Sequence, residues 1–359
     1  MRIPELRIGS LTAPIPIVQG GMGVRVSRFR LAAAVTNQGG IGTLSSIGLG
    51  DIEQSKTDYE AVSRAALVEE IRRAKALTSG PLAVNVMGVL SNALDMVKAA
   101  AAEGVRMIVF GAGLPMKLPK IVEDPSVNLV PIISSVRVAD LILRTWDKHY
   151  GRTVDAFILE GPLAGGHLGF SEDQLSNLQE HSLEKILPQV LTAVRPFSDK
   201  YQKPIPVVVA GGIFTGKDIC RMLALGAAGV QMATRFVCTE ECDVSAEYKQ
   251  AYLNAREEDI VIIHSPVGMP ARAIRTEFLV KLAGDEKPII RCPYHCLTTC
   301  KRDNAKYCIA KALLNSYYGN VKEGIVFCGQ NAYRVKRMYT VPELFAELIA
   351  EMKAEPEPA

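Results

Sequence analysis

The sequence predicts an α/β protein folded as a (β/α)8 TIM barrel, and three observations lead to that fold. Eight short runs rich in Val and Ile recur between residues 15 and 233, each bounded by glycine or polar residues. Most of these runs are apolar at every position, as parallel strands buried on both faces are. Segments with helical spacing lie between them, and three successive runs start at residues 106, 130 and 154. Eight such repeats favour a closed barrel over a doubly wound open sheet, which is the alternative.

The expected elements alternate along the chain. Strands are expected at residues 15–19, 40–44, 82–86, 106–110, 130–134, 154–160, 205–210 and 228–233. Helical spacing is clearest at residues 27–38, 60–79, 91–104 and 215–226, and a terminal helix with an apolar face is expected at residues 340–354. In a barrel of this kind the chemistry lies at the carboxyl ends of the strands. We therefore expect the functional residues in the segments that directly follow the strands.

Composition and charge exclude several classes of protein. The chain has 359 residues, of which 48% are hydrophobic, and its formal net charge is +3. Its charges are interspersed, and no block of Lys and Arg interleaves with aromatic residues, so we expect no nucleic-acid partner. The first residues lack the apolar core of a signal peptide, and no uncharged apolar run approaches the roughly 20 residues that cross a bilayer. We expect a cytoplasmic protein that makes no membrane contact.

Three regions are expected along the chain. Residues 1–240 would form the barrel, residues 241–324 a helical insert that contains clustered cysteines, and residues 325–359 a return to the barrel with the terminal helix. The sequence leaves open whether the protein forms homo-oligomers.

The loops after the seventh and eighth strands indicate a phosphate site. Gly211 and Gly212 stand at the end of the seventh strand, just before a helix that begins near Thr215, and Thr234 follows the eighth strand. Glycine lets main-chain N–H groups approach an anion, a helix amino terminus adds partial positive charge, and barrels often bind phosphate at this place. A phosphorylated cofactor is therefore expected, although the same glycines would also suit tight loops. The stretch QGGMG does not match the dinucleotide fingerprint, and no separate Rossmann domain is expected.

Several segments carry a resemblance to a known family. They are PIVQGGMGVRVS, AAVTNQGGIGTL, VNVM, EGPLAGGHLG, PVVVAGGIFTGKDICRMLALGAAGVQMATRF, HSPVGMPARAI and EGIVFCGQNAYRV. In order and spacing, over most of residues 14–335, the sequence resembles the flavin-dependent nitronate monooxygenases, also called 2-nitropropane dioxygenases. It is equally similar to their relatives, the flavin-type enoyl-acyl carrier protein reductases.

The resemblance implies a single barrel that binds FMN. Gly21, Met22 and Gly23 would line the isoalloxazine, and Asn85 would reach the flavin or its ribityl phosphate. Phosphate would be held by Gly211, Gly212 and Thr234. The remaining residues expected near the cofactor are Ser134, Glu160, Gly165, Gly166, Gln231 and Ala233. Ala233 departs from the family, whose members usually carry glycine there, and its methyl could push the phosphate loop outward.

The loop after the sixth strand carries the expected catalytic group. His167 lies among Gly161, Gly165, Gly166 and Gly169, so the loop can curl against a flat ring and still project the imidazole. Imidazole titrates near neutral pH and can exchange a proton with a carbon acid. Glu160, at the end of the strand, is expected to orient or brace the loop.

The expected function is FMN-dependent oxidation of alkyl nitronates, a small-molecule reaction with His167 as acid/base beside the flavin. His167 would remove the α proton of a neutral nitroalkane, whereas its imidazolium form would stabilise an anionic nitronate. The first alternative is an NAD(P)H-dependent enoyl-acyl carrier protein reductase, in which the same residue would protonate the α carbon or bind the thioester carbonyl. The second is a flavin or metal redox sensor without turnover.

Four of the eight cysteines are clustered in a C-x3-C-x3-C-x7-C spacing, with His295 among them: Cys292, Cys296, Cys300 and Cys308. Four thiolates can hold a zinc ion or an iron–sulfur cluster. If the segment is helical, the first three would lie along one face, which would equally suit a packed structural helix. Metal binding and free thiols both stay open, with a cluster ahead of zinc because a flavin partner makes electron transfer useful. Packing roles are expected for Cys220, Cys238, Cys242 and Cys328.

Overall fold

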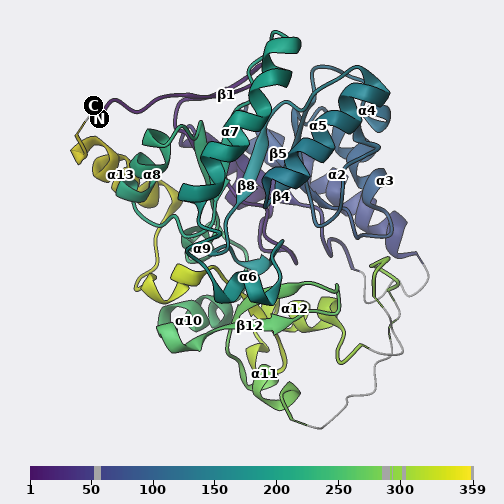
Figure 1. The fold of residues 1–359 in the computed structure, drawn as a ribbon. Coiled ribbons are helices and arrows are strands. Elements are labelled where there is room, and N and C mark those ends of the chain that lie inside the picture. The colour runs from purple at the N-terminus through teal and green to yellow at the C-terminus, as the bar shows by residue number, and fades with distance from the viewer. Residues whose placement is uncertain (52–57, 285–291, 293, 301–304, 357–359) are drawn as a thin grey trace.

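The computed structural model describes residues 1–51, 58–284, 292, 294–300 and 305–356. Eight strands form one parallel sheet in the order β3-β11-β10-β8-β7-β6-β5-β4 (Figure 1). They are β3 (Ile17–Gln19), β4 (Gly42–Ser45), β5 (Leu82–Met87), β6 (Met107–Gly111), β7 (Asn128–Ile133), β8 (Phe157–Glu160), β10 (Val207–Ala210) and β11 (Gly229–Met232).

The sheet closes between its first and last strands. The N–H of Gln19 donates to the carbonyl of Ile41, and the N–H of Ile41 donates to the carbonyl of Ile17, each at 2.9 Å. Every predicted strand has a counterpart in the sheet. The predicted TIM barrel is therefore confirmed, and the open sheet is excluded.

Helices surround the barrel and begin at the expected signals. They are α1 (Phe29–Asn37), α2 (Tyr59–Leu77), α3 (Ala93–Ala102), α4 (Leu118–Ile121), α5 (Val136–Tyr150), α6 (Glu172–Ser176), α7 (Leu183–Lys200), α8 (Gly216–Ala224), α9 (Thr234–Val237) and α13 (Val341–Ala354). Capping boxes at Thr215 and Thr340 start α8 and α13 by satisfying N–H groups of the first turn. The terminal helix α13 packs against α8 and α1, so the end of the chain completes the outer ring.

A short hairpin that the sequence analysis did not predict closes the amino-terminal end of the barrel. It consists of β1 (Leu6–Ile8) and β2 (Leu11–Ala13), which pair antiparallel. Leu6 and Ile8 are fully buried in the barrel's inner core with residues such as Val109 and Ile158. Each such side chain contributes about 1.5 to 3 kcal/mol when it leaves water. The opposite end of the barrel is left for the site.

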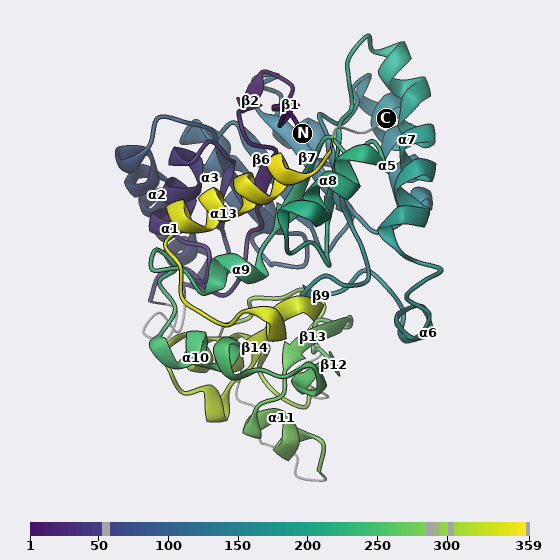
Figure 2. The same ribbon diagram turned by 90° about the vertical axis from the view of Figure 1, so that its left-hand side faces the viewer.

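That opposite end is covered by a second unit, the described part of residues 246–327, which we call the cap (Figure 2). It contains α10 (Ala246–Asn254), η1 (Glu257–Asp259), β12 (Ile260–His264), β13 (Pro270–Ile274), α11 (Glu277–Leu282), α12 (Ile309–Tyr317), η3 (Val321–Glu323) and β14 (Val326–Phe327). Beyond it, η4 (Gln330–Arg334) leads back to the barrel. Strand β13 pairs antiparallel with β12, with β14 and with β9 (Gly166–His167) of the barrel loop.

The cap differs from the predicted helical insert in two ways. It contains helices, but also an antiparallel sheet, because the run IVIIH pairs with PARAI across a turn. The helix considered for the cysteine segment does not form: residues 294–300 are not helical, and α12 begins only at Ile309, after Cys308. The boundaries of the three predicted regions stay predictions. In the part of the chain that is described, no helix is both long and apolar enough to cross a membrane.

Candidate functional site

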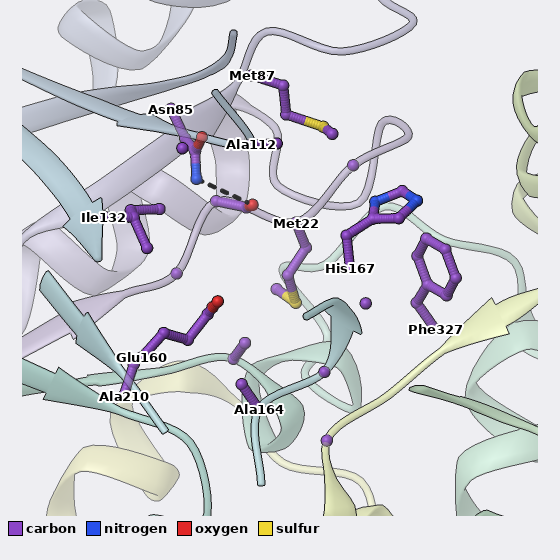
Figure 3. A pocket seen from close by; sticks show the side chains of 18 of the residues that line it. Met22, Asn85, Met87, Ala112, Ile132, Glu160, Ala164, His167, Ala210 and Phe327 are labelled. Carbon is purple, nitrogen blue, oxygen red and sulfur yellow. Dashed lines mark hydrogen bonds between the residues drawn. The ribbon is translucent and has the colours of Figure 1, made fainter. Parts of the chain in front are cut away.

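A cavity of about 430 Å³ lies at the carboxyl ends of the barrel strands, between the barrel and the cap. The structure brings every predicted catalytic and cofactor-binding residue to its wall, and Met22, Asn85, Glu160 and His167 are labelled in Figure 3. The predicted residues are His167, Gly21, Met22, Gly23, Asn85, Ser134, Glu160, Gly165, Gly166, Gly211, Gly212, Gln231, Ala233 and Thr234. Their individual roles stay predictions, but their convergence follows from the fold, because the ends of parallel barrel strands meet at one rim.

The loop after β3 forms one side of the cavity. Asn85 Nδ2 donates to the carbonyl of Gly21 at 3.4 Å (Figure 3). A Cβ on Gly21 would lie 2.3 Å from the Cβ of Asn85, so only glycine fits here. The sequence analysis missed Gln19, which anchors this loop. Its Nε2 donates to Ser27 Oγ at 2.7 Å, and its Oε1 accepts from the N–H of Thr43 at 3.1 Å. The available signal in the sequence was an amide at the end of the apolar run IPIVQ. In the structure this amide is fully buried.

The loops after β10 and β11 present polar backbone to the cavity. Gly211 and Gly212 have φ of 98° and 79°, a left-handed conformation that favours glycine. Their N–H groups donate to no atom of the described residues. Thr234 Oγ1 accepts from the N–H of Gly329 at 3.2 Å, which ties this rim to the chain that returns from the cap.

These loops fit a phosphorylated ring compound such as FMN. Unused N–H groups stand where the fold prefers phosphate. The buried Oε1 of Gln231 has no hydrogen-bond partner among the described residues, so a polar edge of a ligand would satisfy it. Ala233 has φ of −130°, outside the region that requires glycine, and its departure from the family therefore puts no strain on the loop.

His167 lies on β9, where the loop after β8 joins the cap sheet. Its Nε2 is 2.7 Å from Ser265 Oγ, and its ring packs edge-on against Phe327 with centroids 5.1 Å apart. Figure 3 shows the ring between Met22 and Phe327. Burial lowers the pKa of His167 to about 4, so the imidazole is neutral at pH 7. In the described part of the chain no group hydrogen-bonds to Nδ1.

Glu160 ends β8 with its carboxyl group directed into the cavity (Figure 3). Burial raises its pKa to about 7. We expected this carboxylate to brace the loop, but it makes no hydrogen bond or ion pair with any described residue. The bracing groups are donors instead: Ser134 Oγ donates to the carbonyl of Gly169 at 2.7 Å, and Arg272 Nη1 donates to the carbonyls of Pro162, at 2.9 Å, and Ala164. The loop carbonyls are acceptors, and Ser134 and Arg272 supply the donors that satisfy them.

Arg272 and Ser265 are functional candidates that the sequence analysis left without a role. Both lie in the stretch HSPVGMPARAI, which carried part of the resemblance. Arg272 is 3% exposed, and burial lowers its pKa to about 10, so it stays charged at pH 7. The carbonyls that Arg272 binds belong to residues more than 100 positions earlier in the chain. The available signal in the sequence was only an arginine within an apolar strand pattern.

The cavity wall contains no lysine and no arginine among the described residues. Its cap side is apolar, with Val267, Met269, Ile309 and Leu313 facing the polar rim of the barrel. Since burying an anion without a fixed positive partner is costly, this wall favours a ligand that is neutral on the cap side.

The four clustered cysteines line a second cavity of about 280 Å³, together with His295. In the described part of the chain, no three His, Cys, Asp or Glu side chains are arranged to hold a metal ion. The tentative metal site therefore stays a prediction. The predicted packing residues Cys220, Cys238, Cys242 and Cys328 are all buried.

Comparison with known proteins gives three consistent findings. The family model described as nitronate monooxygenase matches residues 5–351. A (3aS,4S,5R,7aS)-5-hydroxy-7a-methyl-1-oxo-octahydro-1H-indene-4-carboxyl-CoA dehydrogenase of Mycobacterium tuberculosis is 32% identical over 267 residues, 74% of this chain. That match spans 65% of the dehydrogenase, less than two thirds of its length. A probable nitronate monooxygenase of Staphylococcus saprophyticus is 28% identical over 312 residues, covering 79% of this chain and 81% of that protein.

Among solved structures, FabK from Thermotoga maritima superposes with a TM-score of 0.73 at 27% identity. The superposition covers 94% of this chain and 92% of FabK. The likeness therefore extends over both the barrel and the cap.

Proposed function

This chain belongs to the nitronate monooxygenase family, whose members are oxidoreductases, and we propose that it is an FMN-dependent enzyme that transfers hydrogen at the α,β-carbon bond of an acyl thioester. The single observation that carries this choice is the cavity wall, whose described residues include no lysine or arginine and which has an apolar cap side. A thioester is neutral at its reacting end, and its acyl chain can lie against the cap. The 32% identity to a carboxyl-CoA dehydrogenase supports the same substrate class.

FMN would lie along the rim, with its phosphate at Gly211, Gly212 and Thr234 and its polar ring edge near Gln231 and Asn85. Bound there, it would supply a two-electron redox centre next to the substrate. The glycines let the backbone approach the ring and phosphate closely, and the unused N–H groups of the rim provide hydrogen bonds without moving.

His167 would exchange the α proton of the substrate. In dehydrogenation its neutral imidazole would accept the proton from Cα as the double bond forms between the two carbons, and FMN held at the rim would supply the two-electron acceptor for the hydride from Cβ. In the reverse direction the same nitrogen returns the proton. A pKa of about 4 keeps the ring in its basic form at pH 7, while Ser265 on Nε2 holds the ring in place.

Glu160 would bind the thioester carbonyl. With a pKa of about 7 it is largely protonated below neutral pH, and a neutral carboxylic acid can donate a hydrogen bond to an oxygen that gains negative charge. Arg272 would act through the loop, by holding the carbonyls that precede His167 in fixed positions.

Oxidation of nitronates is the second candidate, and the match of the nitronate monooxygenase family model over residues 5–351 favours it. A nitronate is an anion, however, and His167 is neutral at pH 7, so the imidazolium that would stabilise it is absent. A neutral nitroalkane would avoid this conflict.

Anaerobic mixing of the purified yellow protein with candidate substrates tests the proposal. We expect butyryl-CoA to bleach the flavin absorption, and crotonyl-CoA to restore it in chemically reduced protein, whereas propyl-2-nitronate leaves it unchanged. Bleaching by propyl-2-nitronate, with no response to either thioester, would assign nitronate oxidation instead. A flavin that responds to neither class of substrate would favour the redox sensor.

A further inference from the structure

A third cavity, of about 410 Å³, lies between the loops that follow β5 and β6. Its volume is within the range of about 300 to 1,000 Å³ that is usual for small-molecule sites. It adjoins the cavity at the barrel rim, because Leu90, Gly113 and Leu114 line both. No residue assigned above to FMN or to proton transfer lines it. The third cavity is therefore a separate space next to the candidate site.

The loops that frame the third cavity are held in place by the rest of the protein. Trp146 Nε1 donates to the carbonyl of Pro115 at 3.1 Å, which fixes the loop after β6 against α5. The cap fixes the loop after β5, since the N–H of Ser91 donates to the carbonyl of Cys296 at 3.1 Å. A ligand that enters a space framed in this way loses less free energy to the ordering of its site.

The wall of the third cavity combines apolar side chains with two opposite charges. Leu94 and Leu114 are 36% and 54% exposed, so a ligand that covered them would remove apolar surface from water. Asp95 and Lys117 are the charged residues among the described part of the wall, and neither forms an ion pair with another described residue. The cavity thus offers an apolar surface and an available cation to one ligand.

A buried amide at the same wall lacks a partner. Asn92 is 3% exposed, and its Nδ2 donates to Ser63 Oγ at 2.9 Å. Its Oδ1 accepts no hydrogen bond from any described residue. Buried acceptors are normally hydrogen-bonded, so an amide N–H of a bound ligand would supply the missing donor.

These features match the arm on which acyl thioesters are carried. Coenzyme A and acyl carrier proteins share this arm, 4′-phosphopantetheine, which has amide groups, an apolar dimethyl group and a phosphate remote from the sulfur. The phosphate is poorly suited to the rim cavity, whose described wall holds no lysine or arginine. The cysteine cavity also adjoins the rim, but it is smaller, about 280 Å³, and its described wall likewise holds neither residue. The third cavity alone among these three combines the space with a cation in its described wall.

We propose that the third cavity is the subsite for the 4′-phosphopantetheine arm of the substrate. Leu114 would lie against the apolar part of the arm, Asn92 Oδ1 would accept from an amide N–H, and Lys117 would bind the phosphate. The inference rests on the proposed function, which supplies the thioester. The sulfur would lie where the two cavities meet, so that the acyl chain extends toward His167 and the arm extends toward solvent. The enzyme would then recognise the carrier separately from the acyl chain.

The first test is calorimetric titration of the FMN-loaded protein with 4′-phosphopantetheine and with pantetheine, which lacks the phosphate. We expect wild type to bind the phosphorylated compound about fivefold more tightly, as suits a single partly solvated charge pair, and to lose this preference in about 1 M salt. Lys117→Ala should bind both compounds equally. The matched control is Lys120→Ala, an exposed lysine of α4 that does not line the cavity, and it should keep the preference.

A change in the apolar wall should act on both compounds. Leu114→Ser should weaken the binding of each by at least about threefold, because less apolar surface is covered. Leu141→Ser is the matched control, since Leu141 is 44% exposed on α5 and lies outside the cavity. Wild type that binds neither compound, or a preference for phosphate that survives in Lys117→Ala, would overturn the proposal. If Leu114→Ser does not fold, the comparison of Lys117→Ala with Lys120→Ala still decides.

The second test identifies the carrier. Chemically reduced protein is mixed with crotonyl-CoA or with crotonyl-acyl carrier protein, and the concentration that gives half-maximal flavin reoxidation is measured. The carrier with the lower value is the preferred one, and for that carrier Lys117→Ala should raise the value about fivefold, whereas Lys120→Ala should not. Equal values for wild type and Lys117→Ala with both carriers would overturn the role of the lysine.

The inference and the proposed function can fail separately. Calorimetry needs no turnover, so binding of the arm without a flavin response to any thioester would contradict only the proposed function. The crotonyl thioester of N-acetylcysteamine lacks most of the arm. A flavin that responds to this thioester at the same concentrations as to crotonyl-CoA would contradict only the subsite.

Discussion

The barrel rim and the cap face the same cavity, but they contribute different chemistry. The rim presents glycine backbone, the N–H groups of Gly211 and Gly212, and the amide oxygen of Gln231, none of which has a hydrogen-bond partner in the part of the chain that the structure describes. The cap presents apolar side chains and, behind them, the cysteine cavity. Polar backbone fixed by a barrel suits a cofactor that stays in place, whereas an apolar wall suits a variable substrate. The difference agrees with the proposed function, in which the rim would hold FMN and the cap would select what reacts with it.

His167 stands where the two regions join. Its strand β9 belongs to the loop after β8 but pairs with β13 of the cap, and its Nε2 contacts Ser265 of the cap. The histidine is therefore supplied by the rim and positioned by the cap. The following changes test how far that division holds.

Replacing His167 with alanine should give the largest effect. Loss of the group that exchanges the α proton should reduce kcat by about 100- to 10,000-fold, while flavin content stays at the wild-type level because the rim holds the cofactor. Steady-state turnover and the flavin-to-protein absorbance ratio measure both. Unchanged turnover of every tested substrate would end the acid/base assignment.

Replacing Arg272 with methionine should destabilise the junction between cap and rim. It leaves the buried carbonyls of Pro162 and Ala164 without their donor, at a cost of about 2 to 3 kcal/mol. Denaturant unfolding monitored by circular dichroism measures the loss. The matched control, Arg275→Met, changes an exposed arginine just beyond the same strand and should stay within about 0.5 kcal/mol of wild type. Equal effects of the two changes would show that Arg272 does not brace the loop.

Replacing Glu160 with glutamine should change the pH dependence of stability. Burial raises the carboxyl pKa from 4.5 to about 7, so the folded protein holds a proton that the unfolded chain has released. Wild type therefore loses stability as the pH rises from about 5 to 8, and the glutamine variant lacks this loss. We expect the difference between the Tm of the variant and the Tm of wild type to increase by on the order of 2 °C as the pH rises over that range. The exposed Glu258→Gln serves as control, and parallel Tm curves for Glu160→Gln and wild type would contradict a buried, unpaired carboxyl.

Replacing Ser265 with alanine should give the smallest effect. The imidazole loses one hydrogen bond worth about 1 kcal/mol, so kcat should fall roughly fivefold with KM nearly unchanged. Ser265→Thr keeps the hydroxyl and should recover most of the rate. A rise in KM without a change in kcat would mean that the cap serine binds substrate instead of positioning the ring.

Much of the rim could be predicted from sequence because its signals are local. Apolar runs of four to seven residues mark buried parallel strands, and whatever follows them must meet at one end of the barrel. His167, Glu160 and the paired glycines were placed in this way. The cap was less predictable, since β13 pairs with β9 and with β14, and the paired residues Gly166 and Arg272 are 106 positions apart in the chain. Neither β9 nor β14 is longer than two residues, which is too short to show a period.

The sequence by itself determined the succession of strands and helices, the end of the strands at which the candidate site lies and the identity of the residues placed there, because apolar runs and glycine positions are properties of short segments. That the sheet closes between β3 and β4 was decided by the tertiary structure. Only the tertiary structure decided that His167 is neutral, that Arg272 rather than Glu160 braces its loop, and that four cysteines share one cavity beside the site. These properties depend on burial and distances, which exist only after segments remote in the chain have packed together.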